Sequence, residues 1–130
     1  MTKEEKELLL KDLSSRLPYG VILSVGIFDN GNMKYHNEKL DYHSNLLSII
    51  ELDGGYYSNN LLCRYSQFTV KPYLRPMSSM TENENKELFQ LMGGGTDIRR
   101  IDFYISHHLD FRGLIETGLA LEAPKGMYKY

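Results

Sequence analysis

The sequence predicts one α+β domain, residues 1–130, with an N-terminal helix, an antiparallel sheet or small barrel of about five short strands, and a helical C-terminal third. Three observations support this class. Apolar residues recur at helical spacing near the start, alternate with period two between tight turns in the middle, and return to helical spacing after residue 80. A chain of 130 residues can bury a core without disulfides.

The N-terminal helix has a start signal and a stop signal. Thr2 and Glu5 have the spacing of a capping box, in which each side chain bonds the other residue's backbone amide. One apolar stripe follows, formed by Leu9, Leu13 and Leu17. Pro18 cannot continue a helix, so we expect the helix to end near Arg16.

The middle of the chain predicts short strands joined by turns. The first strand has an apolar face made by Val21, Leu23, Val25 and Ile27. Asn30-Gly31 is typical of a two-residue hairpin turn, so a second strand is expected over 33–40. Further candidate strands are 46–52, 56–65 with a break at 59–60, and 68–73. A helix before a short-stranded barrel is typical of SH3-like or Sm-like architecture, an analogy of fold alone.

Helical patterns return in the last third of the chain. Thr81 and Glu84 form a second capping box, and glycines 93–95 predict the end of that helix. A further stripe at helical spacing consists of Ile98, Ile101, Ile105 and Leu109. A last short helix is expected from Asp110 to Gly118.

Composition limits the class of protein. Hydrophobic residues make up 42% and charged residues 25% of the chain, which is typical of a globular protein. The single cysteine, Cys63, favours a reducing compartment. The first ten residues lack a signal peptide's apolar region, and the longest apolar stretch, 21–28, is too short to span a bilayer. We therefore expect a cytoplasmic protein with no membrane partner.

Positive charge gathers in one segment, although the whole chain has a net charge of −2. Residues 54–81 contain three basic residues, no acidic residue and several interleaved aromatic residues. Such a pattern can stack bases and hold phosphates. The candidate nucleic-acid or partner surface consists of Arg64, Tyr65, Lys71, Tyr73 and Arg75. The alternative is that the tyrosines cover a sheet and the cations are ordinary surface residues.

The stretch SHHLDFRG, residues 106–113, forms a candidate polar cluster of His107, His108, Asp110 and Arg112. Adjacent histidines on a helix point about 100° apart and do not readily share a metal ion. We favour an elbow between two helices, with Asp110 capping the second helix by accepting from the amide of Arg112 or Gly113. No residue is assigned as catalytic or metal-binding, and no cofactor is expected.

Three phrases of the sequence resemble those of a known family. They are LLLKDLSSRLPYGVI (8–22), VKPYLRPMSSMTENENKELFQL (70–91) and IDFYISHHLDFRGLIETGLALEAPKGMY (101–128). They resemble small uncharacterised proteins encoded in gut anaerobic bacteria, their prophages and mobile elements. The resemblance implies an accessory role and carries no functional residue over to this chain.

Three functions follow as hypotheses. The first is a non-enzymatic module that binds a protein partner or itself, because no catalytic constellation stands out and ten tyrosines suit contact surfaces. The second is nucleic-acid binding through residues 54–81. The third, and least favoured, is an enzyme or metal site around His107 and Asp110.

Overall fold

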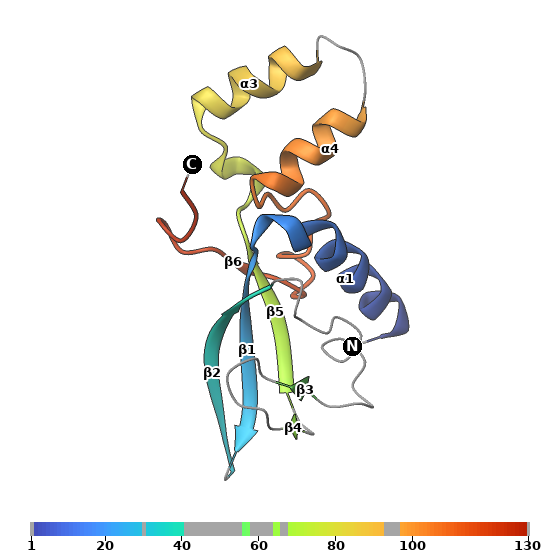
Figure 1. Cartoon of the computed structure of the whole chain (residues 1–130), viewed down its shortest axis with the longest axis vertical. Coiled ribbons are helices and arrows are strands. Elements are labelled where there is room, and N and C mark those ends of the chain that lie inside the picture. The colour runs from blue at the N-terminus through green and yellow to red at the C-terminus, as the bar shows by residue number, and fades with distance from the viewer. Residues whose placement is uncertain are drawn as a thin grey trace. The chain divides into compact units, whose positions relative to one another are not determined.

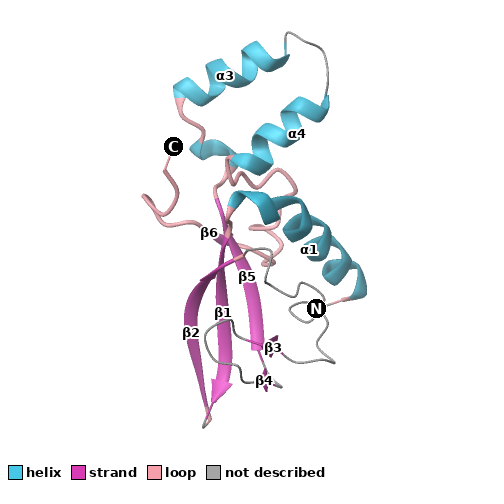
Figure 2. Ribbon diagram, in the orientation of Figure 1, coloured by secondary structure: helices cyan, strands magenta, loops and turns pink. Residues whose placement is uncertain are grey.

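The computed structural model describes residues 2–29, 31–40, 56–57, 64–65, 68–92 and 97–129 (Figure 1). Helices and strands both contribute, with an N-terminal helix and further helices toward the C terminus, so the α+β class is confirmed (Figure 2). The chain divides into two compact units, Met1–Tyr73 and Leu74–Tyr130, and each is described by itself. The single domain expected from the sequence stays a prediction.

Helix α1, Lys3–Arg16, has the predicted bounds. Its capping box is complete, since the Thr2 hydroxyl accepts from the Glu5 amide at 3.1 Å and the Glu5 carboxylate accepts from the Thr2 amide at 2.9 Å. Leu9 and Leu13 of the predicted stripe are buried. A short 3-10 turn, η1 (Leu17–Tyr19), follows and leads the chain toward the sheet.

The main sheet is open and has the strand order β2-β1-β5-β6. Strands β1 (Ile22–Asp29) and β2 (Asn32–Lys39) form the predicted hairpin, and β5 (Phe68–Leu74) pairs antiparallel with the other side of β1. Strand β6 is Leu121–Glu122. Because β2 and β6 end the order without pairing with each other, the closed barrel alternative was wrong.

A second sheet has two short strands, β3 (Tyr56–Tyr57) and β4 (Arg64–Tyr65), paired antiparallel. The strand expected at 46–52, the break at 59–60, Cys63 and the helix stop at glycines 93–95 all lie outside the described residues.

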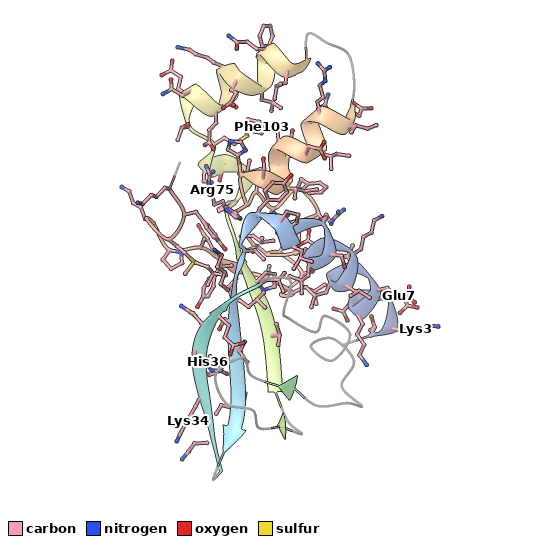
Figure 3. The ribbon with its side chains drawn as sticks, in the orientation of Figure 1. Lys3, Glu7, Lys34, His36, Arg75 and Phe103 are labelled. Atoms are coloured by element: carbon pink, nitrogen blue, oxygen red, sulfur yellow. The ribbon has the colours of Figure 1, made fainter. Side chains whose placement is uncertain are left out.

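One face of the main sheet holds most of its buried apolar residues. Residues of one face are buried and mostly apolar: Val21, Leu23, Val25, Leu40 and Val70. This is the face predicted from the alternation in the first strand. Glu38 lies on the same face, opposite Leu23, and is 8% exposed. Its carboxylate is 3.0 Å from Nε2 of His36, two residues earlier on β2 (Figure 3).

The second unit contains a 3-10 turn, η2 (Met77–Ser79), and two helices, α3 (Glu82–Met92) and α4 (Asp97–Ser106). Leu88, Phe103 and Leu109 form a buried apolar cluster. The apolar stripe predicted after residue 97 is buried only in part, since Ile98 is 70% and Ile101 41% exposed. No helix among the described residues is both long and apolar enough to cross a membrane.

The short helix expected over 110–118 does not form, and the segment consists of turns. Gly113 and Gly118 have φ values of 75° and 82°, which lie in the left-handed region. A right-handed helix cannot contain Gly113 in that conformation, so the backbone turns back instead. The prediction failed because Gly113 was read as part of the first turn of a helix.

Candidate functional site

The candidate surface lies on the first unit, on the face of the main sheet opposite the apolar one. Successive strand residues point to opposite faces, so one face collects residues of alternate positions from β2 and β5. We call this the open sheet face and define it by Tyr35, Asn37, Lys39, Lys71 and Tyr73.

Register brings these side chains together across the central strand. Ser24 of β1 lies opposite Asn37 of β2 on one side and opposite Lys71 of β5 on the other. Gly26, two residues further along β1, lies opposite Tyr35. The aromatic ring and the ammonium group therefore flank a strand that carries a hydroxymethyl group and no side chain at these two positions.

Exposure and charge favour contact with an anion. Tyr35 is 67% exposed, Lys39 is exposed, and Lys71 and Tyr73 are half-buried. Strands β1, β2 and β5 place no carboxylate on this face. The end of the Lys39 side chain approaches Gly20, whose φ of 68° lies in the left-handed region that favours glycine. The described strand residues of this face therefore carry positive charge only, in a chain whose net charge is −2.

Two of the five residues predicted for a basic–aromatic surface, Lys71 and Tyr73, lie on the open sheet face. Arg64 and Tyr65 make up β4 in the separate two-stranded sheet. Arg75 belongs to the second unit, where it is enclosed.

Sequence reasoning missed Tyr35 and Lys39, which lie outside the basic segment 54–81. The usable signal was the hairpin turn at Asn30-Gly31. A two-residue hairpin loop predicts the register of β2 against β1, and the observed pairing places the odd-numbered residues of β2 on the face opposite the apolar one.

The Arg75 side chain of the second unit, labelled in Figure 3, makes several hydrogen bonds to protein groups. Its guanidinium donates to both carboxylate oxygens of Glu84, at 2.7 and 2.9 Å. It also donates to the hydroxyl and carbonyl oxygens of Ser79, at 3.3 and 3.1 Å, and to the carbonyl oxygen of His107, at 3.1 Å. Only 2% of Arg75 is exposed, so this arginine links protein segments instead of facing solvent.

Glu84 has two structural roles. It completes the predicted capping box at the start of α3, because Thr81 and Glu84 exchange hydrogen bonds of 2.9 and 3.1 Å. The bidentate hydrogen bonds from Arg75 lower the pKa of Glu84 to about 2, and bonds to Thr81 add to the effect against the opposing influence of burial. The carboxylate is therefore held in its charged form.

The two adjacent histidines have separate partners. The His107 ring stacks on Phe103 with centroids 3.9 Å apart, and its Nδ1 lies 2.8 Å from the Phe103 carbonyl oxygen. The His108 ring stacks on Tyr128 at the same centroid distance. His108 has a φ of 61°, a left-handed conformation that turns the chain at the end of α4.

Asp110 caps the next segment, but through amides other than those expected. Its Oδ1 accepts from the Leu114 amide at 2.8 Å and its Oδ2 accepts from the Ile115 amide at 2.9 Å. The amide of Arg112 or Gly113 was predicted as the donor, and that detail was wrong. The difference arises because the capped segment is a wider turn and not the first turn of a helix.

The remaining polar groups do not converge on one point. The Arg112 guanidinium lies over the Phe111 ring, 4.4 Å from its centroid, which is a cation–π contact. Within the described part of the chain, no three His, Cys, Asp or Glu side chains are arranged to hold a metal ion.

The second unit also has a small pocket of about 200 Å³. Arg75 and Ser79 form part of its wall, and Glu122, Lys125 and Tyr128 line it from the C-terminal segment. Its charged groups from that segment have opposite signs and are exposed. The pocket therefore lacks the single-sign charge that distinguishes the open sheet face.

Comparisons with known proteins identify no relative of this chain. No family model, curated protein or solved structure matches the chain. Function must therefore be argued from the side chains and their surroundings.

Proposed function

We propose that the protein is a non-enzymatic binding module that docks an anionic macromolecule on the open sheet face. The observation that supports this is that Lys39, Lys71 and the exposed ring of Tyr35 share one sheet face, on which these strands place no carboxylate. Tyrosine gives a large contact area at a low entropy cost, and lysines attract the partner.

The contacts of the polar residues in the second unit favour a binding module over an enzyme. His107 and His108 stack on separate aromatic rings, and Asp110 bonds two backbone amides. Side chains that stack on rings or bond backbone amides in this way stabilise the local fold. An accessory setting in a phage or mobile element belongs to the same proposal and is supported by the resemblance in the sequence alone.

Chromatography on immobilised heparin, a sulfated polyanion, tests the proposal. The double variant Lys39→Glu/Lys71→Glu should elute at lower salt than the unchanged protein. The matched control, Lys3→Glu/Lys11→Glu, alters two exposed lysines of α1 and changes the net charge equally. Equal shifts for the two variants, or no retention of the unchanged protein at low salt, would contradict a binding face on the sheet.

A further inference from the structure

We infer that the occupant of the open sheet face is a single nucleic-acid strand, an inference that rests on the proposed function. The face combines two kinds of group that such a strand needs. Lys39 and Lys71 can pair with phosphates, and the exposed ring of Tyr35 can stack on a base.

The exposed ring of Tyr35 stands beside small residues of the central strand. Neighbouring strands lie about 4.8 Å apart, so side chains of β2 and β5 stand about 10 Å apart across β1. Between Tyr35 and the β5 residues, β1 presents Gly26 and Ser24, which project little above the sheet. Ser24 is only 7% exposed and Gly26 is also buried, so a base would stack on the exposed Tyr35 ring and would not lie against the central strand.

The exposed aromatic ring favours a single nucleic-acid strand over other anionic ligands. In a duplex the bases are already stacked on each other, so a protein ring gains nothing unless a base leaves the stack. An acidic protein surface supplies carboxylates for the lysines but no base for the ring. Stacking on aromatic rings tolerates any base, so the inference predicts little sequence preference.

The experiment measures binding of a labelled 12-nucleotide oligo-dT by fluorescence anisotropy at low salt, next to a duplex of the same length and poly-glutamate. Tyr35→Ala should weaken oligo-dT binding roughly 5- to 150-fold, the range of one lost stacked base, and Tyr35→Phe should retain it. Tyr19→Ala, which removes an exposed tyrosine from η1 outside the sheet, should leave binding unchanged. With two phosphate contacts, the slope of log affinity against log salt should be about −1.4.

Each outcome decides between the two proposals. Retention on heparin without binding of oligo-dT would overturn the single strand and leave the anionic binding module standing. Equal binding of oligo-dT, duplex and poly-glutamate, or no effect of Tyr35→Ala, would also overturn it, because charge alone would then account for binding. Failure to bind oligo-dT and heparin alike would overturn both.

Discussion

Lys71 and Arg75 lie four positions apart in one basic stretch of sequence, yet the structure uses them in opposite ways. Lys71, in the first unit, belongs to a sheet face without carboxylates on its three long strands. Arg75, in the second unit, makes five hydrogen bonds to protein acceptors and is 2% exposed. The planar guanidinium can satisfy several acceptors at fixed angles, which makes arginine suited to an enclosed ion pair. Local charge in a sequence therefore overstates the charge that a surface can offer.

The largest effect should come from breaking the enclosed pair. Arg75→Met leaves the Glu84 carboxylate buried without its main partner, so the free energy of unfolding should fall by about 3–5 kcal/mol in denaturant titrations. The double variant Arg75→Met/Glu84→Gln should recover part of the loss, because no unpaired charge remains. A loss below about 1 kcal/mol for the single variant would show that the ion pair contributes no more to stability than an exposed one.

The pair should also set the acid stability of the protein. Folding lowers the pKa of Glu84 from 4.5 to about 2, so between these pH values the unfolded state binds more protons than the folded state. The stabilisation is complete above pH 4.5 and is lost as the pH falls toward 2, with a contribution of about 3 kcal/mol. Unfolding titrations between pH 2 and 6 should show this slope, and Glu84→Gln should flatten it. An unchanged slope in Glu84→Gln would assign the acid sensitivity to other carboxylates.

Asp110 should have an intermediate effect. Asp110→Ala removes acceptors from two backbone amides, so the free energy of unfolding should fall by about 2 kcal/mol. A cap that bonded a single amide would leave Asp110→Asn nearly neutral. Because each carboxylate oxygen accepts from a different amide, asparagine can satisfy only one, and a loss of about 1 kcal/mol is now expected. Equal stability of the asparagine variant and the unchanged protein would contradict the two-amide cap.

Lys71 should have the smallest effect on folding. Lys71→Ala should change the free energy of unfolding by less than about 0.5 kcal/mol, because its side chain is half-buried on an open face. The same variant should weaken binding of heparin. If Lys71→Ala destabilised the protein as much as Arg75→Met, the contrast between the two cations would be lost.

Local signals in the sequence predicted those parts of the fold that depend on neighbouring residues. The capping boxes at Thr2 and Thr81 and the antiparallel pairing of the first two strands each begin from groups within three or four positions, and all three are confirmed. The ion pair of Arg75 with Glu84 spans nine positions and depends on the turn η2 between them. Residue types alone did not indicate that pairing.

The candidate surface shows the same limit. Lys71 and Tyr73 could be selected from sequence because they share one strand and one face. Tyr35 and Lys39 join them only through pairing of β2 with β1 and of β1 with β5, and β5 begins far along the chain from β1. The exposed half of the stripe on α4 was misjudged for a related reason, because helical spacing shows which residues share a face but not whether another element covers it.

The double role of Glu84 has a consequence for hydrogen exchange. The first turn of a helix ordinarily frays, and its amides exchange through small local openings. Here the carboxylate that caps α3 is also held by Arg75, whose backbone amide and carbonyl bond to His108 and Asp110. Fraying at Thr81 would therefore have to disturb the ion pair as well. The amide of Glu84 should therefore exchange as slowly as the amide of Asp110, because both would open in one cooperative unit.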